Sequence, residues 1–398
     1  MGDIEKVTVQ AVSSIAEIDA ESWDACAFGS SAPDASRGYN PFVSHAFLKA
    51  LEESGSAAME TGWLPRHLLL QGPDGELQGA MPCYVKSHSQ GEYVFDHGWA
   101  DAFERAGGAY YPKLQSAVPF TPVTGPRLLV PDCPDKQERQ SLLLQAGASL
   151  TNQLELSSLH ITFLTEEEWK LAGQIGYLQR TDQQFHWQNE GYASFDDFLS
   201  VLASRKRKAL KKERREAVAD GIETEWITGA DLTEAHWDAF FEFYQDTGAR
   251  KWGRPYLNRR FFSLVSEAMP ERIVLMLAKR DGNYIAGALN FAGGDTLYGR
   301  YWGCAEHHPF LHFELCYYQA IDFAIERGLA RVEAGAQGEH KLARGYLPTP
   351  TYSAHYFRDA SLAAAVSDYL RRERRAVSHE IALLSEESPF KKSDTDKI

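Results

Sequence analysis

The chain has 398 residues, of which 44% are hydrophobic and 12% aromatic, which allows about two to three domains with a sizeable core. A net charge of −14 argues against a general nucleic-acid binder, because attraction to phosphate needs positive potential. Neither a run of about 18 apolar residues nor a secretory signal is visible, so no membrane span is expected. Five scattered cysteines without paired spacing indicate reduced thiols in a cytoplasmic protein.

The first half of the sequence predicts a mixture of strands and helices. A Pro-Asp-Gly turn between two apolar runs indicates a β-hairpin within residues 66–87. The stretch 106–130 is rich in Gly and Pro and is predicted to be a loop. Strands are expected over 7–12 and 159–164, and helices over 18–27, 44–54, 136–154 and 166–176.

The second half begins with an extended segment over 182–191. Ser194 is suited to cap a helix that has Asp197 at its third position and that ends at Gly221. An apolar stripe indicates another helix over 312–328, which Gly328 ends. Further helices are expected over 234–253, 258–270 and 362–384, and strands over 222–227, 272–282, 284–294, 296–304, 330–336 and 351–357.

Both halves therefore have the same order of elements: strand, helices, antiparallel strands, helix, strand. No block of sequence recurs at a fixed period, so this is a structural similarity and not a sequence repeat. We predict an α+β protein of two similar domains, each a mixed sheet flanked by helices. The first domain is expected over 1–185, the second over 186–385, and a flexible tail over 386–398.

The segment "SRKRKALKKERRE" concentrates eight Lys and Arg residues in an acidic protein. Such a run is typical of a solvated helix face, and a nuclear localisation patch is a further alternative. The cations exceed what pairing with the two nearby glutamates neutralises, so a contact to phosphate or to an RNA backbone is the functional hypothesis. The candidate residues for binding phosphate or an acyl donor are Arg205, Lys206, Arg207, Lys208 and Lys212.

The histidine-rich stretch "WGCAEHHPFLHFE" raises the question of a metal site. Pro309 interrupts the helical spacing that two ligating histidines need, so a polar turn is preferred and no metal site is expected. His312 or Glu314 is a candidate for substrate contact. Cys304 is compatible with a nucleophile working with His340, but a buried or half-buried thiol is the preferred interpretation.

The segment "VEAGAQGEHKLARGYLPTPTY" places a carboxylate, an imidazole and two cations within six residues, among glycines that allow tight turns. Its glycine spacing fits neither a Walker loop nor a dinucleotide fingerprint. A His or Glu removes a proton from an amine, and fixed cations hold phosphate or stabilise an oxyanion. A solvent-exposed hinge loop is the alternative to a site made of Glu339, His340, Lys341 and Arg344.

Two long stretches, "FELCYYQAIDFAIERGLARVEAGA" and "GEHKLARGYLPTPTYSAHYF", resemble the closing part of the Fem-type peptidyltransferases. The segments "GAQGEHKLARGY" and "RYWGC…LHFELCYY" resemble still more a bacterial family of N-acyltransferases associated with peptidoglycan biosynthesis and recognition. This resemblance spans nearly the whole chain. It implies two GNAT domains in tandem, with Lys341 at the basic position of the Fem pattern and residues 205–212 at its basic helix.

The resemblance also implies transfer of an acyl or aminoacyl group to an amine. No bound cofactor is expected; acyl-CoA or aminoacyl-tRNA would serve as cosubstrate, tRNA through the basic helix, and a small molecule or peptidoglycan precursor would be the acceptor. Glu339 or His340 would take the amine proton, while Lys341 would bind phosphate or stabilise the oxyanion. The remaining candidates for substrate binding are Arg344, Arg300, Tyr298, Trp302, Glu314, His312 and Gln337.

Two further hypotheses belong to other functional classes. The acetyl-CoA loop of ordinary GNAT enzymes, Q/R-x-x-G-x-G/A before a helix, is not evident in the sequence. Its absence favours a non-catalytic module that binds a peptidoglycan precursor or glycan on a degenerate GNAT fold. The other hypothesis is an RNA-binding protein that uses only the basic helix, and its affinity would fall steeply with salt.

Overall fold

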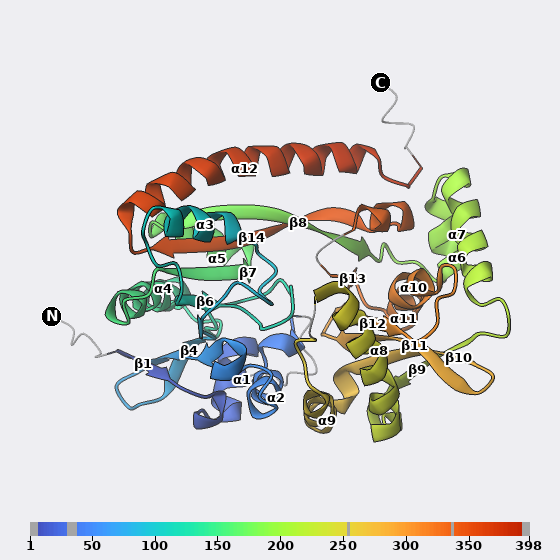
Figure 1. Cartoon of the computed structure of the whole chain (residues 1–398), viewed down its shortest axis with the longest axis horizontal. Helices are drawn as coiled ribbons and strands as arrows, with labels where there is room; N and C mark the ends of the chain where they lie inside the picture. Colours follow the sequence, from blue (N-terminus) through green and yellow to red (C-terminus); the bar gives the residue numbers. More distant parts are fainter. Residues whose placement is uncertain (1–6, 30–37, 253–254, 336–337, 392–398) are drawn as a thin grey trace. The chain divides into compact units, whose positions relative to one another are not determined.

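The structure is a computed structural model that describes residues 7–29, 38–252, 255–335 and 338–391. The chain forms two compact units (Figure 1). Unit 1 comprises residues 1–182, 256–261 and 350–378, and unit 2 comprises residues 183–255, 262–349 and 379–398. The chain therefore passes between the units several times.

Unit 1 contains two groups of paired strands. A small antiparallel sheet has the order β1-β3-β4, and a second group has the order β2-β5-β6-β7-β14. Within the second group β6 and β7 are parallel, and every other pair is antiparallel. The strands are β1 (Thr8–Val12), β2 (Trp63–Pro65), β3 (His67–Gln71), β4 (Leu77–Met81), β5 (Tyr84–Lys86), β6 (Lys113–Ser116), β7 (Ser158–Leu164) and β14 (Leu347–Phe357, of which residues 350–357 belong to this unit).

The helices of unit 1 bury apolar side chains against these strands. Leu143 and Leu144 of α4 share a core with Leu68 of β3 and Leu159 of β7. The helices are α1 (Ala20–Phe28), α2 (His45–Glu53), α3 (His97–Arg105), α4 (Lys136–Gln153), α5 (Glu166–Gln174) and the first part of α12 (Ala360–Glu386). The short strand β6 lies inside the stretch that the sequence predicts to be a loop, so that prediction is wrong for residues 113–116.

Unit 2 is built on a sheet with the order β8-β13-β12-β11-β10-β9. Only β12 and β13 pair in parallel; the other neighbours are antiparallel. The strands are β8 (Leu178–Gln188, of which residues 183–188 belong to this unit), β9 (Glu223–Thr228), β10 (Ile273–Arg280), β11 (Asn283–Ala292), β12 (Thr296–Cys304) and β13 (Arg331–Glu333).

Helices cover both faces of this sheet (Figure 1). Successive side chains of a strand point to opposite faces. Ala286 and Ala288 of β11 join the core formed with α11, whereas Gly287 between them faces Phe240 of α8. The helices of unit 2 are α6 (Phe195–Val201), α7 (Ser204–Ala217), α8 (Glu234–Trp252), α9 (Arg259–Ala268, of which residues 262–268 belong to this unit), α10 (Leu311–Phe313) and α11 (Gln319–Glu326).

Two local features of unit 2 shape its surface. Ser194 caps α6 by accepting a hydrogen bond from the Asp197 amide, as predicted, but the predicted single helix is broken at Leu202 and Ala203 into α6 and α7. Between α10 and α11 the helix widens into a π-helical turn, η7 (Glu314–Tyr318). Such turns occur frequently at functional sites.

The predicted fold class, α+β with mixed sheets flanked by helices, is confirmed. In the described part of the chain, no helix is both long enough and apolar enough to cross a membrane.

Candidate functional site

The parallel strands β12 and β13 separate within unit 2, and the candidate site lies where they separate. They pair only from Thr296 opposite Arg331 to Tyr298 opposite Glu333, and β12 then continues to Cys304 without β13 beside it. On its other side β12 pairs with β11, where Asn290 faces Gly299 and Leu289 faces Tyr301, so Arg300 is an extra, bulged residue. Bulges of this kind redirect side chains and are common beside active sites.

A small cavity of about 100 Å³ opens beside this bulge. Asn290 lies in its wall with 1% of its surface exposed, and its amide nitrogen donates to the carbonyls of Val274 and Ala288 at 3.3 and 3.2 Å. These two bonds fix the orientation of the amide. No described residue donates to the other atom, Asn290 Oδ1, although it is buried. Buried acceptors are normally satisfied, so Oδ1 is suited to receive an N–H or O–H group of a ligand.

Lys341 is buried, with 2% of its surface exposed. It does not line this cavity, but it interacts electrostatically with two residues that do, Cys316 and Arg300. It belongs to the short helix η8 (Glu339–Arg344), and its Nζ donates to the carbonyl of Gly335 at 3.0 Å. Burial, together with the nearby Arg300 guanidinium, lowers the pKa of Lys341 to about 7. A large share of Lys341 is therefore a neutral amine near pH 7, able to accept a proton.

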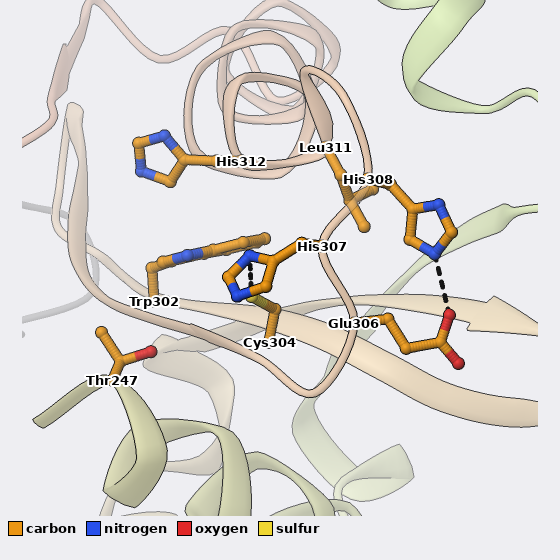
Figure 2. Close-up of a pocket in the computed structure, with 8 residues that line it drawn as sticks. All are labelled: Thr247, Trp302, Cys304, Glu306, His307, His308, Leu311 and His312. Atoms are coloured by element: carbon orange, nitrogen blue, oxygen red, sulfur yellow. Dashed lines mark hydrogen bonds and ion pairs between the residues drawn. The ribbon is translucent and has the colours of Figure 1, made fainter. Parts of the chain in front are cut away.

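A larger cavity of about 270 Å³ adjoins the end of β12 (Figure 2). Its lining comes from β12, from the loop that follows, from α10 and from Thr247 of α8. Trp302 and His312 line both this cavity and the small one, with ring centroids 5.1 Å apart. This pair of rings is thus a wall that the two cavities share. The residues around the larger cavity are Thr247, Trp302, Cys304, Glu306, His307, His308, Leu311 and His312.

A third hollow of about 380 Å³ lies between α7 and η8. Arg205 and Lys206 line it, and so does the buried Arg344. The Arg344 guanidinium lies 3.5 Å from the centre of the Phe313 ring and donates to Glu213 at 2.7 Å. Because Glu213 is neutralised by this ion pair, the exposed Arg205 and the half-buried Lys206 give the hollow a positive charge, which favours an anionic group.

Three of the predicted substrate-binding residues line the small cavity or the larger cavity. Arg300 lines the small cavity, and Trp302 and His312 line both. Arg300 is ion-paired with Glu333 at 3.3 Å. Buried Tyr298 packs under the Arg300 guanidinium, with 5.1 Å between the guanidinium carbon and the ring centre.

Glu314 does not line either cavity. Its carboxylate accepts hydrogen bonds from Arg214 at 2.8 Å and from Gln319 at 2.7 Å. Gln337 lies outside the described residues. The binding roles of all these residues remain predictions.

The predicted catalytic residues differ in their surroundings. Glu339 and His340 are exposed, whereas Lys341 is buried. His340 Nε2 lies 2.9 Å from the hydroxyl of Tyr317, which lines the small cavity. Partial burial, and then the charges of Arg344 and Lys341, lower the pKa of His340, so its imidazole is neutral near pH 7. In the described part of the chain the Glu339 side chain makes no hydrogen bond or ion pair.

The basic helix divides into an inner and an outer face. Arg214 is on the inner face, paired with Glu314 and Asp322. Lys212 is exposed and lies 3.6 Å from Glu216. Of the five predicted donor-binding residues, only Arg205 and Lys206 line the hollow between α7 and η8; Arg207, Lys208 and Lys212 do not.

Sequence reasoning did not identify Asn290, Cys316, Tyr317 or the pair of Cys304 with His307. Asn290 stands in an ordinary strand, and nothing near it in sequence marks it as functional. The histidine cluster was the one available signal for His307. In the described part of the chain, no group of three or more His, Cys, Asp or Glu side chains is arranged to hold a metal ion.

The family model for FemAB-like proteins, described as peptidoglycan biosynthesis/recognition, matches residues 14–392. No curated protein matches the sequence at a significant level.

Solved structures with a similar fold include FemX, which is 14% identical with a TM-score of 0.53, over 88% of this chain and 98% of that one. L-PGS from Bacillus licheniformis is 9% identical with a TM-score of 0.50, over 84% of this chain and 98% of that one. A tandem GNAT protein from the clavulanic acid biosynthesis pathway is 11% identical with a TM-score of 0.46, over 88% of this chain and 98% of that one. At these identities the similarity concerns the fold.

Proposed function

The chain belongs to the FemAB-like family, and from this premise we propose that it is an N-acyltransferase whose reaction takes place at the two adjoining cavities of unit 2. An activated acyl group, carried by CoA or by tRNA, would occupy the larger cavity. The amine that accepts it would enter the small one. Because the family is described as acting in peptidoglycan biosynthesis/recognition, a peptidoglycan precursor is the acceptor class that we propose.

Two observations support this proposal: the buried Lys341, whose pKa is lowered to about 7, and the buried acceptor Asn290 Oδ1 in the wall of the small cavity. The small cavity accommodates an amine and a few carbon atoms. An amine placed there would donate one N–H to Asn290 Oδ1, which orients its lone pair toward the carbonyl of the acyl donor. Lys341 would accept the proton that the amine loses on attack, a role that suits a base with a pKa near the working pH.

His340 and Glu339 take different places in this scheme from those expected on sequence. Both are exposed, so neither is shielded with the reacting atoms. His340, neutral and within 2.9 Å of the Tyr317 hydroxyl, would pass the proton on toward solvent. Glu339 is assigned no chemical step.

The cations are also divided by their surroundings. Arg300 and Arg344 are held in ion pairs with Glu333 and Glu213, so they act mainly by orienting the walls of the site. Arg205 and Lys206 line an open hollow and form no ion pair in the described part of the chain. We therefore assign the phosphate groups of the donor to these two residues.

The proposal is tested by incubating the full chain with a panel of donors and acceptors and detecting amide products by mass spectrometry. Suitable donors are acetyl-CoA, octanoyl-CoA and alanyl-tRNA, and suitable acceptors are UDP-linked muropeptide and free lysine. We expect an amide from at least one combination, and a rate at least about 100-fold lower in Lys341→Met. Lys170→Met is the control, because Lys170 is an exposed residue of unit 1.

A second outcome would support the binding module instead. If no combination gives an amide, while the muropeptide alone raises the melting temperature, then the protein recognises the precursor without modifying it. This would contradict the N-acyltransferase proposal.

A further inference from the structure

We propose that Cys304 is a nucleophile that carries the acyl group as a thioester before it reaches the amine, so that transfer proceeds in two steps. This inference rests on the proposed function and adds a covalent intermediate to it. It starts from the larger cavity, where a thiol and an imidazole face the same space (Figure 2).

Cys304 is the last residue of β12, where the strand runs beyond the end of β13. Its Sγ lies 3.8 Å from Nδ1 of His307, three residues later, because the chain turns back over the strand end (Figure 2). A thiol within reach of an imidazole can give up its proton to form the thiolate, which is the nucleophilic form. With only 5% of its surface exposed, Cys304 is reached through the cavity that it lines.

The two neighbouring histidines of this loop have different surroundings. His308 Nε2 lies 2.8 Å from Glu306, and the same carboxylate is paired with Arg280 at 2.8 Å. His307 instead points at the thiol (Figure 2). The carboxylate therefore acts on His308, and His307 is the residue placed to exchange a proton with Cys304.

The cavity that holds the thiol shares part of its wall with the small cavity. Trp302 lies beside Cys304 in the lining of the larger cavity and also lines the small one, and His312 does the same from α10. An acyl group on Cys304 would thus lie against the two rings that both cavities share. The amine held at Asn290 would approach the thioester carbonyl from the other side.

The two steps balance without an external oxidant or reductant. In the first, the Cys304 thiol passes its proton to His307, and the thiolate attacks the carbonyl of an acyl-CoA. The bond from the acyl carbon to Cys304 Sγ forms, and the bond from the acyl carbon to the CoA sulfur breaks. CoA leaves as a thiolate and takes the proton from His307. In the second, the amine attacks the Cys304 thioester, an amide forms and the Cys304 thiolate leaves. Lys341 takes the amine proton, and His307 restores the thiol through a proton from solvent.

A first experiment needs no knowledge of the donor. The rate of Cys304 alkylation by iodoacetamide is measured between pH 6 and pH 9 by peptide mass spectrometry. When the pH is lowered from 9 to 6, the alkylation rate of an ordinary thiol falls by more than about 100-fold, because the thiolate is protonated. For Cys304 we expect the rate to fall by less than about tenfold, and His307→Asn should restore the pH dependence of an ordinary thiol. Cys133 in unit 1 is half-buried and serves as the internal reference. An ordinary profile in the wild type, or no alkylation at any pH, would overturn the proposal.

A second experiment looks for the intermediate. The protein is mixed with acetyl-CoA or octanoyl-CoA, quenched in acid and analysed as the intact chain. We expect a mass increase of one acyl group, removable by neutral hydroxylamine, that maps to Cys304 and is absent in Cys304→Ala. Cys133→Ala is the matched control and should keep the adduct.

The results separate this inference from the proposed function. If Cys304→Ala forms amide at the wild-type rate, the covalent step is wrong and the amine attacks the donor directly. If an adduct forms on Cys304 but no amide appears with any acceptor, the thioester stands and the proposed acceptor chemistry fails. If the acyl group is found on Cys316 instead, the assignment of Cys304 is wrong.

Discussion

Each unit of the protein buries a lysine, and the two lysines have opposite surroundings. In unit 1, Lys113 at the start of β6 has its Nζ 2.6 Å from Glu92 and 2.5 Å from Asp96, with a further bond to Ser89 at 2.8 Å. In unit 2, the Nζ of Lys341 donates a hydrogen bond to the backbone carbonyl of Gly335 and forms no ion pair with a described carboxylate. Both side chains are almost fully buried, at 1% and 2% exposure.

The pKa values follow from the neighbours rather than from burial alone. Burial opposes the charged form of both lysines. In Lys113 the two carboxylates outweigh burial and raise its pKa, whereas in Lys341 burial prevails and lowers the pKa to about 7. A buried lysine that forms ion pairs is therefore structural, whereas a buried lysine without an ion pair and with a lowered pKa is a candidate base.

The largest expected effect is on the stability of unit 1. Replacing Lys113→Met leaves Glu92 and Asp96 buried without their cation. We expect the free energy of unfolding to fall by about 3–5 kcal/mol, as is usual when one partner of a buried ion pair is removed. Chemical denaturation followed by circular dichroism measures it. The variant Lys170→Met, which removes one partner of an exposed ion pair, should change the free energy of unfolding little. An equal loss of free energy of unfolding in both variants would contradict the comparison.

The corresponding change in unit 2 should have the opposite sign. Lys341→Met removes an amine whose charged form is disfavoured by burial. We expect the free energy of unfolding at pH 7 to rise by about 1–3 kcal/mol, while N-acyl transfer is lost. Differential scanning calorimetry shows the direction. A marked loss of stability with full activity would show that Lys341 is structural.

The pH dependence of stability should also differ between the two lysines. Between about pH 7 and 10.5 the unfolded chain holds the Lys341 proton and the folded chain does not, so this residue makes stability rise with pH, by up to about 1.4 kcal/mol per pH unit. The contribution of Lys113 is fully present below its unfolded pKa and is lost as pH rises through its raised folded pKa. Unfolding of wild type, Lys341→Met and Lys113→Met is measured from pH 6 to pH 10. Over this range the Lys341 contribution should change with pH, whereas the Lys113 contribution should stay constant. A difference between wild type and Lys341→Met that stays constant over this range would exclude the lowered pKa.

The smallest expected effect concerns the acceptor cavity. Asn290→Leu removes the unsatisfied Oδ1 and keeps a similar volume. We expect the KM for the amine to rise about tenfold, which corresponds to one lost hydrogen bond, with little change in the KM for the donor. Asn290→Asp keeps an acceptor oxygen and should recover part of the affinity. Equal KM values in wild type and the leucine variant would remove Asn290 from the site.

Local signals in the sequence predicted much of the fold. The Ser194 cap was correct because a cap depends on residues three positions apart. The strand β6 was missed because it has four residues among Pro and Gly, and its pairing partners β5 and β7 are distant in sequence. The break between α6 and α7 was missed because Leu202 and Ala203 carry no breaker residue; Ala203 bonds instead to Pro389, far along the chain.

In the candidate site, too, local sequence motifs predicted some residues, whereas properties that depend on distant residues were not predicted. Lys341, Trp302 and His312 were predicted from motifs that are continuous in sequence. The charge state of Lys341 was not predictable, because it depends on which distant residues surround it; Lys113 likewise has no acidic residue beside it in sequence. The assignment of the proton to Glu339 or His340 assumed that neighbours in sequence share one environment. In the structure both are exposed and Lys341 is buried, which is why we propose Lys341 as the base.

The most direct test of Lys341 as the base is the pH dependence of amide formation at saturating donor and acceptor. In the wild type, log kcat should rise with a slope of one up to about pH 7 and then level off, because the neutral form of Lys341 accepts the proton. In Lys341→Met the rate should be at least about 100-fold lower and should lack this rise. A variant that keeps the wild-type rate and the same rise would show that another group takes the proton.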